Sequence, residues 1–241
     1  MPITNYDGET FVAYLDISGF RELMKNEGEA LKVLDKFYKS GYYSLEDQTT
    51  GCRIEGIFIS DCGVLFARRN SNTAPCTAEC LLALLDKVKR INMKMIDNDY
   101  MLTTSIAYGK FKYQERIEFE GIEKNLIYGN AYVSAFLDNE KGKPKIQPGQ
   151  CRIVKQNLPP TVRSVIEHND NNDSFKMIKK REGDNEHYYY YWMVNNSHEI
   201  KRFEQNYRNS YNLKYAGMLR SIKGETNRND AEIRDHGIYS G

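Results

Sequence analysis

The spacing of hydrophobic and polar positions predicts the first elements of the chain. Residues 11–15 form an apolar run that is typical of a buried strand, and the run ends at Asp16. Apolar side chains recur at helical spacing from Phe20 onward. A second apolar run, residues 52–67, is interrupted by a Ser-Asp-Cys-Gly sequence, which predicts two strands joined by a tight turn. Asp61 is then expected at the tip of a hairpin.

The next segment completes an order of elements that indicates a fold class. A helical stripe at residues 81–95 is followed by an alternating segment at residues 100–108, which predicts a strand that stops at Gly109. The resulting order is strand, helix, strand, strand, helix, strand. This order is typical of a ferredoxin-like α+β fold, with an antiparallel sheet and both helices on one face.

The pattern beyond Gly109 predicts shorter elements and one C-terminal helix. We expect a polar hairpin-like segment, a short helix, two strand-like runs and an amphipathic helix, at residues 110–128, 130–140, 175–180, 187–194 and 196–223. Residues 1–224 then form a single domain with its core at about 10–195. The polar tail, residues 225–241, shows no packing pattern.

Charge and composition limit the partners of this domain. The 241 residues include 34 Lys and Arg against 33 Asp and Glu, with a pI of about 7.6, so no overall field attracts nucleic acid. No stretch approaches the roughly 18 apolar residues that a membrane span needs, and the N-terminus lacks the layout of a signal peptide. We expect a cytoplasmic protein that binds neither nucleic acid nor membrane.

The five cysteines are expected to be reduced and buried. They are odd in number, lie mostly in apolar segments and include no Cys-x-x-Cys pair. None of the four histidines lies near Cys76 and Cys80 in the sequence, so a zinc site would need a tertiary arrangement that the sequence does not show.

Two carboxylates stand where a strand ends or turns, so that water and ligand can reach them. The first and third strands of a ferredoxin-like sheet are neighbours, and we therefore expect Asp16 and Asp61 to converge. They could share Mg²⁺, a hard cation that prefers carboxylate oxygens. The loop at residues 17–20 leads into a helix N-terminus of the kind that attracts phosphate. The alternative is structural, with Asp16 as a helix N-cap and Asp61 as an ordinary turn residue.

Four short motifs, in order along the chain, resemble the catalytic domains of class III nucleotidyl cyclases. They are Leu-Asp-Ile-Ser-Gly-Phe, the hairpin Ser-Asp, Ile-Ala-Tyr-Gly and Tyr-Gly, at residues 15–20, 60–61, 106–109 and 128–129. The resemblance implies an enzyme that cyclises a nucleoside triphosphate with two Mg²⁺ or Mn²⁺ ions, in composite sites of a homodimer. It implies that Asp16 and Asp61 are the catalytic metal ligands, joined by Ile17. It also implies that the substrate phosphates lie along Ile17, Ser18, Gly19 and Phe20.

The resemblance also identifies departures from the family. Ile57 and Leu126 occupy the positions that hold Lys and Asp in adenylyl cyclases, so the usual hydrogen-bond recognition of a purine is not expected. Val133 and Leu137 occupy the positions of the family's transition-state Asn and Arg. Either the register shifts within residues 135–140 or another cation substitutes. The candidate cations, each also interpretable as a solvated loop charge, are Lys141, Lys143 and Lys145.

A late lysine and a narrower resemblance complete the hypothesis. The family's triphosphate-binding lysine corresponds to Lys179 or Lys180, with a solvated strand end as the equal alternative. Three segments, at residues 129–136, 143–146 and 213–219, resemble the stand-alone cyclases of bacterial Pycsar antiphage systems, which make cyclic UMP or cyclic CMP. This resemblance implies a pyrimidine substrate, with UTP favoured over CTP.

Two other functions stay open. The chain could be a purine cyclase that uses ATP or GTP, or a degenerate cyclase domain that binds nucleotide or dimerises without catalysis. The tyrosine run at residues 188–191 is interpreted as strand packing rather than base stacking.

Overall fold

The computed structural model describes most of the chain up to residue 200. The described residues are 3–46, 51–69, 77–119, 122–168, 173–194, 196 and 199–200, with the backbone alone at 115–119, 122–125 and 173–174. The predicted C-terminal helix at 196–223, apart from three residues, and the tail at 225–241 lie outside the described residues.

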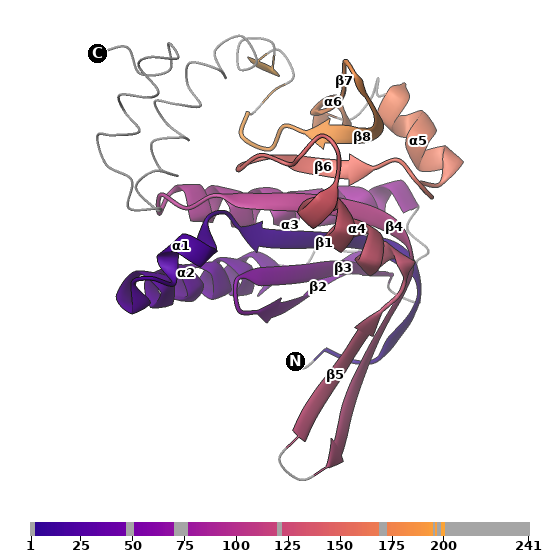
Figure 1. Cartoon of the computed structure of the whole chain (residues 1–241). Helices are drawn as coiled ribbons and strands as arrows, with labels where there is room; N and C mark the ends of the chain where they lie inside the picture. Colours follow the sequence, from indigo (N-terminus) through magenta and orange to yellow (C-terminus); the bar gives the residue numbers. More distant parts are fainter. Residues whose placement is uncertain are drawn as a thin grey trace, which may run out of the picture.

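Strands and helices follow the order that the hydrophobic pattern predicts for the core (Figure 1). The elements are β1 (Tyr6–Ile17), α1 (Phe20–Leu23), α2 (Glu27–Glu46), β2 (Cys52–Ile59), β3 (Cys62–Arg69), α3 (Thr77–Ile96), β4 (Leu102–Phe119), β5 (Ile122–Tyr128), α4 (Asn130–Lys141), β6 (Cys151–Val154), α5 (Pro160–Glu167), α6 (Asp173–Lys176), β7 (Ile178–Arg181) and β8 (Asp184–Tyr190). The predicted order of strand, helix, two strands, helix and strand is confirmed from β1 to β4.

One mostly antiparallel sheet organises the molecule. Its strand order is β2-β3-β1-β4-β6-β8-β7, and β5 pairs with β4 to form a hairpin arm that extends away from the body (Figure 1). The pairing of β4 with β6 is parallel, and the other pairings are antiparallel. Helices α2 and α3 cover one face and α4 covers the other (Figure 1). The α+β, ferredoxin-like prediction is therefore confirmed.

The alternation of β1 directs its side chains to two separate cores. Phe11 and Leu15 join the large cluster beneath α2 and α3, whereas Val12 and Tyr14 join a smaller cluster beneath α4. Successive side chains of a strand point to opposite faces. The side chain of Asp16, two residues after Tyr14, therefore lies on the α4 face.

Two boundaries differ from the sequence prediction. Strand β4 does not stop at Gly109 but continues to Phe119, because β1 and then β5 supply hydrogen-bonding partners along its polar half. Gly109 serves a close approach instead: a Cβ there would collide with the side chain of Asn130 at the start of α4. The strand expected at 175–180 is also wrong in its first half, where α6 ends at Lys176 before β7 begins.

Two of the five cysteines are paired. Cys52 at the start of β2 forms a disulfide with Cys80 of α3, so the expectation that every thiol is free is wrong for these two residues. Cys62 and Cys151 are free thiols. Cys76 lies outside the described residues.

Candidate metal and nucleotide site

Asp16 and Asp61 meet where β1 ends beside the β2–β3 hairpin. Asp16 pairs with Cys62, the residue after Asp61, in the antiparallel register of β1 and β3. The backbone N–H of Ile17 donates to the carbonyl oxygen of Asp61 at 3.0 Å. The structure therefore brings together the two carboxylates that the sequence singled out.

The charged side chains that act on Asp16 are acidic. Burial, the largest cause, and the carboxylates of Asp61 and Glu140 together raise the pKa of Asp16 to about 7. Each of these effects disfavours the ionised form. A divalent cation would reverse the balance, because its charge favours ionised carboxylates and its coordination shell accepts their oxygens.

The donor set fits a metal ion that also binds substrate. Within the described part of the chain, no group of three or more His, Cys, Asp and Glu side chains is arranged to hold a metal. Mg²⁺ commonly uses one or two protein carboxylates and completes its shell with water and phosphate oxygens. Asp16 and Asp61 would supply that pair, so the residues present fit Mg²⁺ or Mn²⁺ brought in with a polyphosphate.

The loop after Asp16 is held close to the hairpin and to β4. The N–H of Ser18 donates to Met101 O at 2.9 Å, and Gly19 takes a left-handed conformation with φ of 78°. The Ser18 side chain is buried, and its hydroxyl has no hydrogen-bond partner among the residues described. The N–H groups of Ile17 and Ser18 are therefore used within the chain, and the Ser18 hydroxyl is, among the described residues, an unsatisfied buried group beside the loop.

The helix expected from Phe20 is broken, which changes the phosphate argument. Helix α1 has only four residues, with Phe20 and Leu23 buried in the core, and α2 begins at Glu27. A single turn carries little macrodipole. The loop backbone from Ile17 to Phe20 stays a predicted phosphate site, but the predicted long helix behind it is wrong.

The two predicted base-contacting residues lie at different distances from Asp16. Ile57 on β2 pairs with Val64, which pairs in turn with Tyr14, so Ile57 lies on the α4 face near Asp16. Leu126 on β5 pairs with Gln114 on the hairpin arm, at the far end of β4 from the strand partner of Asp16. One chain therefore does not bring Leu126 to the carboxylates.

The outward face of α4 is apolar where the family has its transition-state side chains. Val133 and Leu137 are 46% and 44% exposed. The candidate cations that follow, Lys141, Lys143 and Lys145, are exposed at the end of α4 and in the segment after it.

The late lysines lie at the opposite edge of the sheet. Strand β7, which carries Lys179 and Lys180, is separated from β1 by β4, β6 and β8. Lys180 forms an ion pair with Glu167 at 2.8 Å. Within one chain these lysines do not reach Asp16, so a contact with the same triphosphate would require a second copy.

The tyrosine run packs as predicted. Tyr188, Tyr189, Tyr190 and Tyr191 are all buried in the large core cluster. The hydroxyls of Tyr188 and Tyr189 donate to Glu167 and Asp184 at 2.7 and 2.6 Å. Their rings are therefore not available for base stacking.

Sequence reasoning missed Glu140 as a site residue. Its charge acts on Asp16 from the last turn of α4, next to the buried Asp138 and Asn139. The run of four consecutive polar residues, 138–141, that ends this helix was the available signal.

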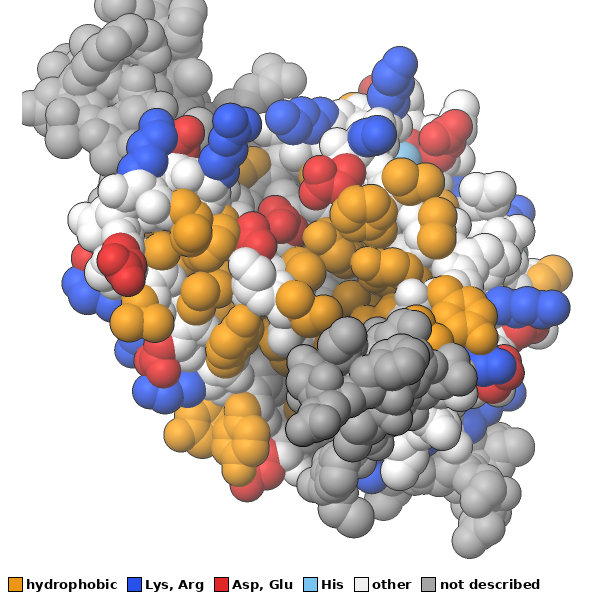
Figure 2. All heavy atoms as spheres, turned by 60° about the horizontal axis from the view of Figure 1, so that its bottom comes forward, with side chains coloured by type: hydrophobic (Ala, Val, Ile, Leu, Met, Phe, Trp, Pro, Cys, Tyr) orange, Lys and Arg blue, Asp and Glu red, His pale blue; other side chains and the backbone are white. Residues whose placement is uncertain are grey.

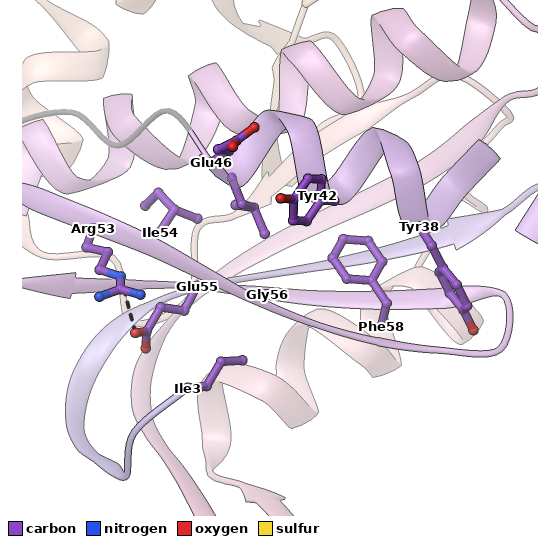
Figure 3. Close-up of a pocket in the computed structure, with 10 residues that line it drawn as sticks. Ile3, Tyr38, Tyr42, Glu46, Arg53, Ile54, Glu55, Gly56 and Phe58 are labelled. Carbon is purple, nitrogen blue, oxygen red and sulfur yellow. Dashed lines mark ion pairs between the residues drawn. The ribbon is translucent and has the colours of Figure 1, made fainter. Parts of the chain in front are cut away.

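A separate pocket lies at the edge strand β2, on the side of the sheet that α2 covers (Figure 3). It measures about 530 Å³ and is lined by Tyr38 and Tyr42 of α2 and by Phe58 of β2. Arg53 and Glu55 form an ion pair of 3.4 Å at its rim (Figure 3). None of the predicted site residues lines this pocket.

Comparisons with known proteins identify the fold. No protein-family model matches the chain, and no curated protein is similar to it in sequence. The guanylyl cyclase domain of the RhoGC fusion protein from Blastocladiella emersonii superposes with a TM-score of 0.54 at 10% identity, covering 78% of this chain and 97% of that one. The RhGC guanylate cyclase domain from Catenaria anguillulae, solved with GTP, gives 0.51 at 10% identity, covering 78% and 97%.

A third solved structure extends the likeness to an adenylyl cyclase. A bacterial light-regulated adenylyl cyclase has a TM-score of 0.55 at 11% identity, and the match covers 92% of this chain but 59% of that protein. No helix among the described residues has the length and apolar character that crossing a membrane requires. The three solved structures together show that the chain has the fold of the catalytic domains of nucleotide cyclases.

Proposed function

We propose that the protein is a metal-dependent nucleotidyl cyclase that converts a pyrimidine nucleoside triphosphate to its 3′,5′-cyclic monophosphate and pyrophosphate. The observation that carries this proposal is the meeting of Asp16 and Asp61 on a cyclase fold, with the pKa of Asp16 raised to about 7 by burial and neighbouring acids. A carboxylate pair held in this state is suited to divalent cations.

The reaction is a single displacement at phosphorus. The ribose 3′-oxygen bonds to the α-phosphorus while the bond to the oxygen that bridges to the β-phosphorus breaks, so pyrophosphate leaves and the hydroxyl proton passes to solvent. Asp16 and Asp61 would hold the Mg²⁺ or Mn²⁺ ions. When bound, such ions lower the pKa of the attacking hydroxyl and neutralise the triphosphate.

The remaining tasks are positioning and charge stabilisation, which dominate phosphoryl transfer. The loop from Ile17 to Phe20 would orient the phosphates through its backbone at Gly19 and Phe20, because the N–H groups of Ile17 and Ser18 already bond to Asp61 O and Met101 O. Lys179 or Lys180 would approach the triphosphate from a second copy of the chain.

The pyrimidine preference rests on the character of two side chains. The side chains of Ile57 and Leu126 have neither a hydrogen-bond donor nor an acceptor at the positions where adenylyl cyclases bind the edge of the purine. A site without such polar groups cannot select a purine by hydrogen bonding. The solved neighbours are guanylyl and adenylyl cyclases by name, so base choice is the point at which this chain would depart from them. UTP is favoured over CTP, and a role in antiphage signalling rests on the sequence resemblance alone.

A homodimer with composite sites is supported by the surface around α4. Ile59, Val133 and Leu137 are each more than two-fifths exposed. Figure 2 shows hydrophobic side chains spread over one face and interrupted near its middle by a few acidic side chains. Apolar patches of this kind mark association surfaces. A second copy seated there would supply the residues that one chain leaves distant from Asp16.

The direct test is to incubate the purified chain with Mn²⁺ and each of ATP, GTP, CTP and UTP in turn. Cyclic UMP or cyclic CMP is the expected product. Cyclic product from ATP or GTP alone would contradict the pyrimidine assignment, and no product from any of the four would contradict the cyclase assignment. Asp16→Ala and Asp61→Ala should both be inactive, and full activity in either variant would remove the proposed metal role.

A second candidate function is a nucleotide-binding module without catalysis. The observation that favours it is the apolar, exposed pair Val133 and Leu137 at the family's transition-state positions. Calorimetric titration with nucleoside triphosphates distinguishes the two functions. Tight binding without turnover under Mg²⁺ or Mn²⁺ would favour the module.

A further inference from the structure

A buried polar network holds the last turn of α4 against three strands. Asp138 is 8% exposed, and its carboxylate accepts hydrogen bonds from Ser105 Oγ of β4 at 2.6 Å and from Arg152 Nε of β6 at 2.7 Å. His187 Nε2 of β8 lies 2.7 Å from the other carboxylate oxygen. The second ring nitrogen of His187 is held by Asp184 at 2.9 Å.

Arg152 also donates hydrogen bonds to the backbone at and beyond the end of the helix. One terminal nitrogen donates to the carbonyl oxygen of Asp138 at 2.6 Å, and the other donates to Pro144 O at 2.6 Å. A Cβ at Gly142 would collide with this guanidinium and with the Asp138 carbonyl. The Asp138 carbonyl also accepts from the Gly142 N–H at 3.0 Å, so the buried guanidinium is a second donor to this carbonyl at the helix end. The turn is therefore fixed through both side chain and backbone.

The residues that follow Asp138 lie at the candidate site. Asn139 is buried and accepts a hydrogen bond from Thr103 Oγ1 at 3.0 Å, and Thr103 is the β4 partner of Asp16. The amide nitrogen of Asn139 has no hydrogen-bond partner in the described part of the chain. Glu140 comes next, and its charge acts on Asp16.

We propose that Asp138 is a positioning residue for the metal site: its contacts with Ser105, Arg152 and His187 set the last turn of α4 so that Asn139 and Glu140 lie beside Asp16. This inference rests on the proposed role of Asp16 and Asp61 as metal ligands. A buried ion pair is a poor source of net stability, because desolvation offsets much of its attraction. What such a network supplies is one defined geometry, which a metal site requires.

The test measures Mn²⁺ binding to the full chain without nucleotide, by the electron paramagnetic resonance signal of the free ion. Asp138→Asn removes the charge but keeps the shape, and Gly142→Ala displaces Arg152 while every charged group stays. Both variants should weaken Mn²⁺ binding about tenfold. The matched controls are Glu55→Gln, another buried carboxylate paired with arginines, and Gly28→Ala, where a Cβ meets only an ordinary contact. Both controls should bind Mn²⁺ as the unmodified chain does.

Melting curves separate positioning from stability. A purely structural role predicts that Asp138→Asn and Glu55→Gln lower the melting temperature alike and leave Mn²⁺ binding unchanged, and that result would overturn the inference. Ser105→Ala removes a single donor and should weaken binding two- to threefold, so the test does not depend on the folding of the charged variant.

A double-variant cycle identifies the route of the effect. Glu140→Gln should weaken Mn²⁺ binding in the unmodified chain and have less than half of that effect in the Asp138→Asn background, because a displaced turn no longer presents position 140 to Asp16. Equal effects in both backgrounds contradict the inference. The proposed function fails differently: the unmodified chain then binds no Mn²⁺, or Asp16→Asn binds it undiminished.

Discussion

Two carboxylates on the α4 face of the sheet, Asp138 and Asp16, have opposite electrostatic surroundings. Burial alone raises the pKa of Asp138, but hydrogen bonds from His187, Ser105 and Arg152 outweigh burial and leave the pKa below its ordinary value. The protein itself supplies the positive charge and the donors that an ionised carboxylate needs. The negative charge of Asp138 is therefore compensated within the protein, without any ligand.

The negative charge of Asp16 is not compensated in this way by the described residues around it. Burial and two acidic neighbours, Asp61 and Glu140, together raise its pKa to about 7. A buried carboxylate among like charges is costly unless something from outside compensates for it. The contrast teaches that burial does not identify a functional carboxylate in this fold. What distinguishes Asp16 is that its negative charge is not compensated by the described residues around it.

The largest expected effect follows from removing the charge at Asp16. Asp16→Asn should lower cyclase turnover about a thousandfold, in the range that loss of a central catalytic group costs. It should leave the melting temperature of the metal-free chain unchanged or higher, because an uncompensated buried charge is removed. Asp7→Asn is the matched control, since Asp7 lies on the same strand, is 71% exposed and pairs with Lys112. An Asp16→Asn variant that keeps its activity, or that is markedly less stable, would contradict the difference drawn between Asp16 and Asp138.

The complementary change removes compensation from Asp138. Arg152→Met should cost about 3–5 kcal/mol of unfolding free energy, because breaking a buried pair leaves its partner charged and unpaired. Urea denaturation measures this loss. Arg68→Met is a graded comparison, because Arg68 pairs with Glu55 but is 21% exposed, and it should cost less. Equal losses at the two arginines would show that the Asp138 network has no special dependence on burial.

The two carboxylates should give opposite dependences of stability on pH. Because the folded-state pKa of Asp16 is raised, the folded chain holds the extra proton between about pH 4 and 7, and stability relative to Asp16→Asn should fall as pH rises through that window, by at most about 1.4 kcal/mol per unit. The pKa of Asp138 is lowered, so its contribution is complete above the unfolded-state pKa and is lost on acidification. Unfolding free energies of the two Asn variants and the unmodified chain, measured in chelator from about pH 2 to 8, check both signs. Parallel curves for the two variants would contradict the assignment.

The sequence was sufficient for the half of the site that depends on strand order. The apolar run ending at Asp16 and the interrupted run around Asp61 each carry a local signal, and the strand order of the core then places them together. The end of β4 was not predictable in the same way. Its outer half is polar, and its length depends on pairing with β5 rather than on burial.

The Asp138 network joins residues that are distant in sequence. Asp138, Arg152 and His187 are each polar residues in short elements, and a polar residue of that kind is ordinarily exposed. Only the tertiary fold shows that they compensate one another. The pairing of Cys52 with Cys80 was equally out of reach, since spacing does not determine which cysteines meet.

The smallest effect on the isolated fold is expected on the outward side of α4. Leu137 is 44% exposed, whereas its neighbour Asp138 is buried, so Leu137→Asp should change the unfolding free energy by less than about 0.5 kcal/mol. If this surface joins two copies, the same substitution places a charge in an apolar interface, and sedimentation velocity should show a shift from dimer to monomer. Val165→Asp on α5, 38% exposed, is the control that should leave association unchanged. An undiminished dimer in Leu137→Asp would place the interface elsewhere, and the apolar face of α4 would then have no part in composite sites.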